Sequence, residues 1–296
     1  MLCRSPYIAG VIPCGCGQCI PCRINKRRLW SNRMLLESVK HAGNSFVTLT
    51  YETAPAGDSL NPGHAQLWLK RLRKALYPEK IRFFLVGEYG EQTQRPHYHA
   101  AIFGLDPVVG GGDDGRSGIV KETWGMGHTF TGDLTPESAS YVAGYVTKKM
   151  TSAKDPRLHG RYPEFARMSL RPGLGAHAMQ EVSEVLKTEY GQTIYEKTGD
   201  LPTALRQGRK SLYLGRYLRS VLTRFMGGLC GLQKETPEML LMRLEFEEKN
   251  QALPLSMRWR GRNYWDAFSR YMAEVTEQRA ANMVSQFKTK TAKGYL

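Results

Sequence analysis

The sequence predicts an α+β fold in which helices pack against an antiparallel sheet and a mostly helical region follows. Residues 81–103 contain two apolar stretches joined by a short segment rich in turn formers, which is typical of a β-hairpin. Residues 46–51 form another apolar, strand-like stretch, and residues 64–77 repeat apolar side chains at helical spacing. The order strand, helix, hairpin, strand and helix favours a sheet with helices against it.

The remaining elements follow from local signals in chain order. A basic helix is expected at residues 26–42, after a cysteine-rich start. Residues 106–118 are rich in Gly and Asp and predict a flexible loop, and residues 128–131 predict a short edge strand. Three later helices are expected at residues 210–226, 237–249 and 263–287. The chain then divides into a cysteine-rich basic arm (1–24), a sheet domain (25–180) and a helical C-terminal region (181–296).

The composition indicates a polyanionic partner. The chain has 42 Lys and Arg against 27 Asp and Glu, which gives a formal net charge of +15. Such an excess suits nucleic acid, although many basic proteins bind it without specificity. No apolar run approaches the roughly 20 residues that span a bilayer, and the start lacks the apolar core of a signal peptide. We therefore expect no membrane association and a cytoplasmic location.

The hairpin carries residues that can hold a divalent cation. His97 and His99 are two apart on one expected strand, so their side chains point to the same face. Glu88 ends the partner strand, where the hairpin can bring it opposite the histidines. Two imidazoles and a carboxylate suit Mn²⁺ or Mg²⁺, with positions left open for a phosphate oxygen. The competing interpretation is a pair of ordinary surface or half-buried histidines.

A second motif follows in an expected helix at residues 135–149, which Thr135, Pro and Glu begin. Tyr141 and Tyr145 are four apart and share a face, and Lys148 lies on that face as well. Gly144 costs about 1 kcal/mol relative to Ala, and it leaves room for a DNA backbone or a neighbouring element. The competing interpretation is core packing of the tyrosine pair, although core stripes rarely end in two lysines.

Together, the two motifs predict a site that cuts a DNA strand and keeps hold of the cut end. A phenol with a pKa of about 10 is a poor nucleophile at neutral pH, so it needs a polarised electrophile. A cation at the histidine motif would polarise the scissile phosphate, and Lys148 would add positive charge. Tyrosine attack would free a 3′ hydroxyl and leave a 5′-phosphotyrosine, whose bond energy allows rejoining without ATP.

The cysteines at the start of the chain predict a second metal site. Five of the six cysteines fall within the first 22 residues. In a reducing compartment such a cluster favours a metal over disulfides. The segment Cys19-x-x-Cys22 is half of a zinc knuckle, but a second half is absent, so all ligands must come from this short segment. The expected structural zinc ligands are Cys3, Cys16, Cys19 and Cys22. The alternative is a set of free thiols in a flexible basic arm.

These motifs resemble those of replication initiators in the HUH endonuclease superfamily, which is named for its His-hydrophobe-His motif. The resemblance is narrower to the initiators of the microviruses, and among them to the gokushovirus group. Residues 46–51, 95–104 and 141–149 are similar to the family's first, second and third motifs, in that order. The cysteine-rich start and residues 165–175 also match, so the resemblance covers roughly residues 1–180. Tyr98, between the two histidines, is only partly apolar and departs mildly from the pattern.

The resemblance implies the HUH endonuclease fold for residues 25–180, with the metal motif on a central strand and the tyrosine helix alongside. It implies that His97 and His99 are metal ligands, that Tyr141 and Tyr145 are nucleophiles, and that Lys148 is the motif lysine. Glu88 as a third ligand rests on its position late in the preceding strand.

The implied activity is nicking of replicative-form DNA at an origin, followed by rolling-circle replication and rejoining of the single strand, with Mg²⁺ or Mn²⁺ as the catalytic ion. The chain lacks helicase motifs, so a host helicase and polymerase are expected partners.

Two other interpretations stay open at this point. A plasmid relaxase or a transposase shares the same chemistry, but relaxases carry their tyrosine near the amino terminus, and the paired tyrosines favour an initiator. A non-enzymatic nucleic-acid-binding protein would use the basic surface and a zinc-bound arm, and it would treat both motifs as packing residues. It predicts salt-dependent binding without a covalent product.

Overall fold

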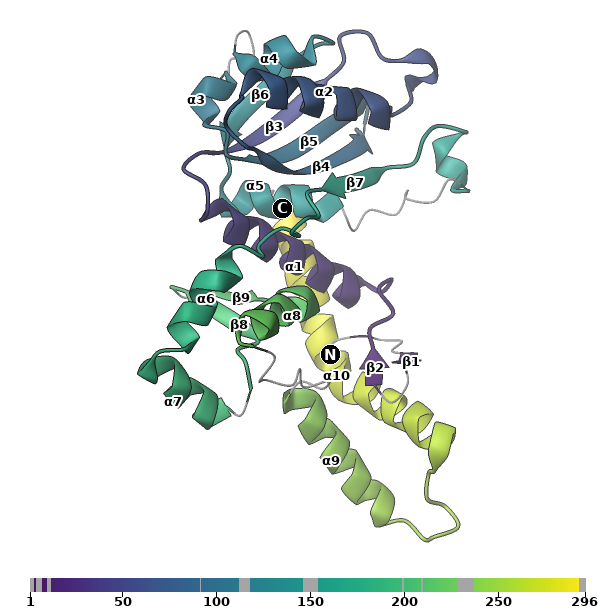
Figure 1. Ribbon diagram of the computed structural model, residues 1–296. Coiled ribbons are helices and arrows are strands. Elements are labelled where there is room, and N and C mark those ends of the chain that lie inside the picture. Colours follow the sequence, from purple (N-terminus) through teal and green to yellow (C-terminus); the bar gives the residue numbers. More distant parts are fainter. Residues whose placement is uncertain are drawn as a thin grey trace. The chain divides into compact units, whose positions relative to one another are not determined.

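The computed structural model describes residues 3, 7–9, 12–90, 92–111, 118–145, 154–198, 200–208, 210–227 and 237–292 (Figure 1). Its contacts form two compact units. The larger unit is Arg27–Gly228, and the smaller one combines Met1–Lys26 with Leu229–Leu296. The predicted limits between three parts of the chain stay a prediction.

The larger unit is built on a five-stranded antiparallel sheet, which confirms the predicted α+β class. The strand order is β6-β3-β5-β4-β7, so β5 is central. The strands are β3 (Asn44–Thr50), β4 (Arg82–Tyr89), β5 (Pro96–Phe103), β6 (Thr129–Asp133) and β7 (Phe165–Met168). The predicted hairpin is β4 and β5, and the predicted edge strand is β6. The other edge, β7, pairs with β4 and was not predicted.

One face of this sheet is covered by α2 (Pro62–Ala75) and by α4 (Ile119–Trp124) (Figure 1). Trp68 of α2 and Trp124 of α4 are fully buried there with Tyr98 of β5. The side chain of Asn61 caps α2 by accepting a hydrogen bond from the backbone N–H of Gly63 at 2.9 Å. Burying these aromatic side chains is worth several kcal/mol, and it fixes which face of β5 points away from the helices α2 and α4.

The opposite face is covered by α1 (Ile20–Ser38), from Arg27 onward, and by α5 (Pro136–Tyr145) (Figure 1). Met34 of α1 and Val142 of α5 are buried against Phe84 of β4. The prediction of a helix at residues 26–42 was wrong at both ends. Helix α1 begins six residues earlier, at Ile20. Pro21 fits in its first turn, because a backbone N–H at that position would have no partner within the helix.

Helix α5 begins as predicted. Thr135 and Ser138 form a reciprocal cap, since each side-chain oxygen accepts from the backbone N–H of the other, at 3.2 and 2.8 Å. Residues 146–149, the rest of the expected helix, lie outside the described residues.

A buried carboxylate ties α1 to the sheet. Glu37 has no exposed surface, and it pairs with Arg82 of β4 and with His41. The backbone N–H of Gly175 also donates to Glu37, at 2.6 Å. Burial alone would raise the pKa of Glu37, but the hydrogen bonds from His41 and Gly175 and the charge of Arg82 outweigh it and hold the pKa below 4.5. Folding therefore keeps this group ionised.

After β7 the chain forms α6 (Ala178–Leu186), α7 (Glu189–Thr198), the hairpin of β8 (Ala204–Gln207) and β9 (Lys210–Tyr213), and α8 (Gly215–Phe225). Helix α1 contacts β9 and α8, and the amide of Asn32 donates to the carbonyl of Tyr213 at 3.3 Å. The guanidinium of Arg33 lies between the rings of Trp30 and Tyr217, 4.3 and 4.5 Å from their centroids. The prediction of one helix at residues 210–226 was wrong, because its first four residues form β9. Gly215, with φ of +64°, makes the turn from strand to helix.

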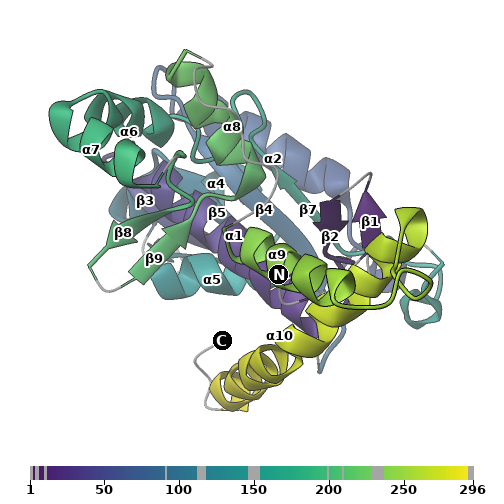
Figure 2. The same ribbon diagram turned by 90° about the horizontal axis from the view of Figure 1, so that it is seen from below.

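The smaller unit holds the short hairpin β1 (Tyr7–Ala9) and β2 (Ile12–Cys14), the start of α1, and two long helices. Helices α9 (Pro237–Gln251) and α10 (Gly261–Ala292) lie side by side in both views (Figures 1 and 2) and share a core around Phe246 and Phe268. Both were predicted within a few residues.

The larger unit also has short helical turns at Ala56–Asp58, Pro107–Gly110 and Pro156–Leu158. No helix in the described part of the chain is long and apolar enough to cross a membrane.

Candidate metal and tyrosine site

The β4–β5 hairpin brings Glu88, His97 and His99 together. In the hairpin register Glu88 lies directly opposite His97, and His99 follows two residues later on the same face. The carboxylate oxygen Oε1 of Glu88 is 2.7 Å from Nε2 of His97 and 3.1 Å from Nε2 of His99. Glu88 and His99 are buried, whereas His97 is half-buried. One ligand atom from each residue lies within 4.8 Å of the other two, so the three can share one ion.

The outer nitrogens of both imidazoles have partners of their own. Nδ1 of His97 is 3.1 Å from the carbonyl oxygen of Arg95, and Nδ1 of His99 is 2.9 Å from the hydroxyl of Thr48. A carbonyl only accepts, so we infer that His97 is protonated at Nδ1 and turns Nε2 toward Glu88. Arg95 is itself anchored, because its guanidinium donates a hydrogen bond to the carbonyl of Tyr51 at 2.8 Å. Such partners are what orient metal-binding histidines in proteins.

This donor set fits a divalent cation. With His97 protonated at Nδ1, its Nε2 lone pair faces a carboxylate oxygen, and two acceptors at 2.7 Å repel each other unless a proton or a metal ion lies between them. Two imidazole nitrogens and one carboxylate oxygen are ligand atoms that a divalent cation accepts. His97, His99 and Glu88 would hold the ion from one side and leave its other positions free.

The two tyrosines of α5 lie against the histidines. The ring of Tyr145 is stacked on His99 with centroids 5.3 Å apart, and the ring of Tyr141 meets His99 edge-on at 5.2 Å. The two phenol rings contact each other at 5.0 Å. Phe46 of β3 also stacks on His99 and touches Tyr141. The two motifs, far apart in sequence, are therefore one cluster of side chains in space.

The two phenols differ in their surroundings. Tyr141 is 40% exposed, and Tyr145 is half-buried. Burial, and after it the negative charge of Glu88, raises the pKa of Tyr145 well above its ordinary value.

A buried arginine braces the tyrosine helix from the side of α1. Nε of Arg27 donates to the carbonyl of Ser140 at 2.8 Å, and only 8% of Arg27 is exposed. Its guanidinium lies beside Gly144, where an added Cβ would meet it at 3.5 Å, an ordinary contact. Arg27 is therefore a neighbour of Gly144 but does not require a glycine there, and the close approach of a DNA backbone stays a prediction.

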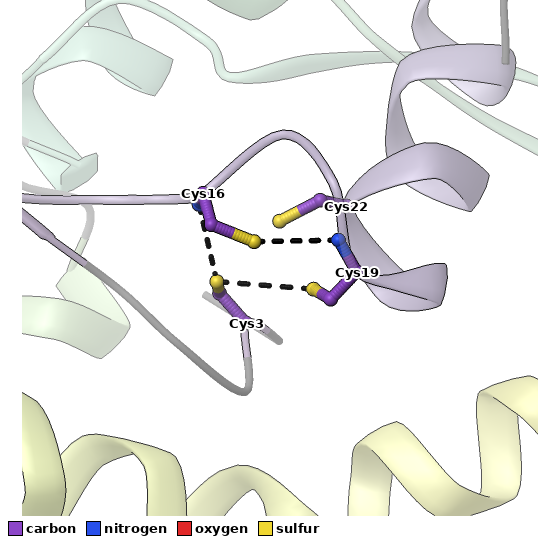
Figure 3. A group of neighbouring side chains, drawn as sticks. All are labelled: Cys3, Cys16, Cys19 and Cys22. Carbon is purple, nitrogen blue, oxygen red and sulfur yellow. Dashed lines mark hydrogen bonds between the residues drawn. The ribbon is translucent and has the colours of Figure 1, made fainter. Parts of the chain in front are cut away.

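Two further predicted groups need placing. Lys148 lies outside the described residues, so its position relative to the tyrosines stays a prediction. The four cysteines predicted as zinc ligands, in contrast, are brought together (Figure 3): Cys3, Cys16, Cys19 and Cys22.

Four residues of the site were not singled out from the sequence: Phe46, Thr48, Arg95 and Arg27. Thr48 could have been found from the sequence, because pairing β3 with β5 places Thr48 opposite His99. Arg95 begins the range 95–104 that is similar to the family's second motif, but nothing in its residue type shows that its carbonyl orients a histidine. Arg27 was one of many basic residues in a predicted helix, and no local signal separates it from its neighbours.

Comparison with known proteins supports the resemblance found in the sequence. Residues 44–150 match a family of replication-associated proteins of the ORF2 type. The matched range contains both the histidine and the tyrosine motif. The replication-associated protein VP4 of Bdellovibrio phage phiMH2K is 34% identical over 161 residues, which are 47% of this chain and 50% of that protein.

Two other phage proteins are similar to a comparable extent. The replication-associated protein ORF4 of Chlamydia phage 1 is 33% identical over 48% of this chain and 40% of its own length. For ORF2 of Spiroplasma virus 4, also a replication-associated protein, the identity is 33% over 59% of each chain. The match thus spans about half the length of these relatives. No solved structure matches the chain.

Proposed function

From its similarity to the replication-associated proteins of small phages, we propose that this chain initiates rolling-circle replication by nicking one DNA strand at an origin. Its substrate would be replicative-form DNA, and the strand that is cut and later rejoined would be held single-stranded. The net charge of +15 suits a DNA partner. A host helicase and polymerase are proposed partners, and the bacterial host cytoplasm, where these enzymes work, is the proposed location.

The proposed reaction is a transesterification at phosphorus. The phenol oxygen of Tyr141 or Tyr145 attacks the scissile phosphate, a tyrosine O–P bond forms, and the bond from phosphorus to the 3′ oxygen breaks. The phenol loses its proton and the departing 3′ oxygen gains one, so no co-reactant is consumed. The reverse reaction, with a 3′ hydroxyl as nucleophile, rejoins the strand. A second tyrosine permits a second attack while the first still holds an end.

Each residue of the site has a role in this scheme. Glu88, His97 and His99 would hold the divalent ion, which supplies charge stabilisation at the phosphate. Thr48 and the carbonyl of Arg95 keep the imidazoles turned toward that ion. Lys148 is proposed to add positive charge to the phosphoryl oxygens. Phe46 packs beneath His99 and Tyr141 and so limits their movement.

One observation carries the proposal: the rings of both tyrosines touch the ring of His99, which shares Glu88 with His97. Core packing alone does not account for this cluster, because Tyr141 is 40% exposed and the three metal-ligand atoms of Glu88, His97 and His99 converge on one point. An exposed phenol beside residues that can hold a divalent ion is the arrangement that phosphoryl transfer needs.

The proposal is tested with a single-stranded origin oligonucleotide labelled on the 3′ side of the nick. Purified protein and Mn²⁺ are added, and a denaturing gel shows whether label travels with the protein. We expect a metal-dependent covalent band with the wild type and with each single Tyr→Phe variant at positions 141 and 145. The double variant should give none, because no phenol is left to attack.

Tyr213→Phe is a matched control, because Tyr213 is an exposed tyrosine outside the site and should not affect the band. If the double variant still forms the band, the nucleophile is a different residue. If oligonucleotides from several phage origins bind tightly but give no band with the wild type, a non-enzymatic DNA-binding role replaces the proposal.

A further inference from the structure

The cysteines at the start of the chain form a separate group, which the nicking chemistry does not use. Cys3 precedes the hairpin of β1 and β2, Cys16 follows it, and Cys22 lies in the first turn of α1. One sulfur atom from each member lies within 4.8 Å of all the others. We call this group the four-cysteine cluster, and its members are Cys3, Cys16, Cys19 and Cys22.

The sulfur atoms converge, as Figure 3 shows, and backbone amides point at them. Sγ of Cys16 accepts hydrogen bonds from the N–H groups of Gln18 and Cys19, at 3.4 and 3.3 Å. Sγ of Cys3 accepts from the N–H of Cys16 at 3.2 Å. Hydrogen bonds from N–H groups stabilise a sulfur atom that carries negative charge, which is the form that binds a metal.

The spacing of the sulfurs distinguishes among the possible occupants. Sγ of Cys19 is 3.9 Å from Sγ of Cys3, which is almost twice the roughly 2.05 Å of a disulfide bond. Four thiolates about 2.3 Å from one tetrahedral ion lie about 3.8 Å from each other. In an iron–sulfur cluster, cysteines bound to different iron atoms hold their sulfurs farther apart than those bound to one ion. Because all four sulfurs lie within 4.8 Å of one another, the group fits a single ion.

We propose that the four-cysteine cluster binds one zinc ion in a closed, tetrahedral, structural site. Four thiolates leave no position open for a substrate, so the site is not catalytic. Thiolates also select zinc over Mg²⁺ and Mn²⁺, which prefer oxygen ligands, so this site and the histidine site take different metals.

A metal ion would strengthen the local fold. Strands β1 and β2 have only three residues each, and a two-stranded hairpin is marginal in water unless other elements support it. Helix α10 contacts β1, and an ion would add a second support. An ion held by Cys3, Cys16 and the start of α1 would close the hairpin against the helix without a large hydrophobic core. Binding energy would then supply folding energy for this segment.

The test measures metal in the purified full-length chain by plasma mass spectrometry. About one zinc per chain is expected in the wild type. The variants Cys16→Ser and Cys22→Ser should retain at most about a tenth of it, because loss of one thiolate opens the site. Cys14→Ser is the matched control: Cys14 lies in β2, two residues from Cys16, but outside the cluster, so its zinc content should equal that of the wild type.

A second measurement covers the case in which the serine variants fail to fold. A mercurial thiol reagent added to the wild type should release the zinc as about four thiols react. The variant His99→Ala should keep its zinc, which separates this site from the histidine site and makes the outcome independent of nicking. Iron with sulfide, a disulfide among the cluster cysteines, or equal zinc loss in Cys14→Ser would each overturn the proposal.

Discussion

The substitution Glu88→Gln separates metal binding from folding at the candidate site. The Glu88 carboxylate lies 2.7 and 3.1 Å from the two imidazole Nε2 atoms. An amide has the same shape, and its NH₂ group can donate to an imidazole lone pair that a carboxylate oxygen repels. We therefore expect the metal-free variant to be at least as stable as the metal-free wild type. Metal binding should weaken strongly, because the only anionic ligand is lost.

The size of the effect follows from linkage. At a Mn²⁺ concentration of about 100 times Kd, the wild type gains about 2.7 kcal/mol. For a unit of about 200 residues, each kcal/mol shifts Tm by roughly 2–4 °C, so the wild-type shift is about 5–10 °C. Loss of a residue that only hydrogen-bonds to a metal ligand lowers the metal affinity about 10–100-fold, so loss of the ligand itself should lower it at least as much. If the variant binds about 100-fold more weakly, it gains only about 0.4 kcal/mol and shifts by about 1 °C.

Differential scanning calorimetry with chelator-washed protein, with and without Mn²⁺, measures both quantities. Glu79→Gln removes an exposed carboxylate outside the site and should keep the full Mn²⁺ shift. The reasoning fails if Glu88→Gln shows the wild-type shift. It also fails if the metal-free variant unfolds several degrees below the metal-free wild type, because Glu88 would then stabilise the fold without an ion.

Three further predictions concern the scaffold. Glu37→Gln should lower the free energy of unfolding at pH 7 by about 3 kcal/mol, because Arg82 loses a buried partner. Since folding lowers the pKa of Glu37, this difference between wild type and variant should shrink as the pH falls below 4.5, and a difference independent of pH in urea titrations would contradict the charge argument. Gly87→Ala should destabilise by about 1–3 kcal/mol, because its Cβ would lie 2.7 Å from the ring of Phe165. Gly144→Ala should be neutral or stabilise by up to about 1 kcal/mol, and the opposite order of these two variants in guanidinium unfolding would refute the packing argument.

The hairpin shows how far the sequence alone reaches. Strands alternate their side chains, so two histidines two residues apart had to share a face, and the short loop fixed which end of β4 lies opposite them. The register of Glu88 with His97 follows from these local rules. What the rules do not give is the contact of Tyr141 with His99. That contact depends on how α5 lies on the sheet, which is set by side chains such as Val142 and Phe84 that any core would contain.

The errors have physical causes as well. Leu214, Leu218 and Leu222 repeat at the four-residue spacing of a helix, so the predicted helix was extended back over the four residues of β9. The start of α1 was missed because a proline at position 21 was read as part of an irregular arm. Strand β7 has only four residues, and its partner in the sheet, β4, is far away in sequence. Short edge strands of this kind depend on tertiary pairing rather than on local propensity.

The most direct measurement is to find the residue that carries the DNA. After reaction with an origin oligonucleotide and Mn²⁺, the protein is digested with protease and nuclease and its peptides are sequenced by mass spectrometry. We predict a nucleotide joined through its 5′ phosphate to Tyr141 or Tyr145, and none when Mn²⁺ is withheld. A nucleotide on any other residue, or cleaved DNA with a free 5′ phosphate and an unmodified protein, would contradict the account.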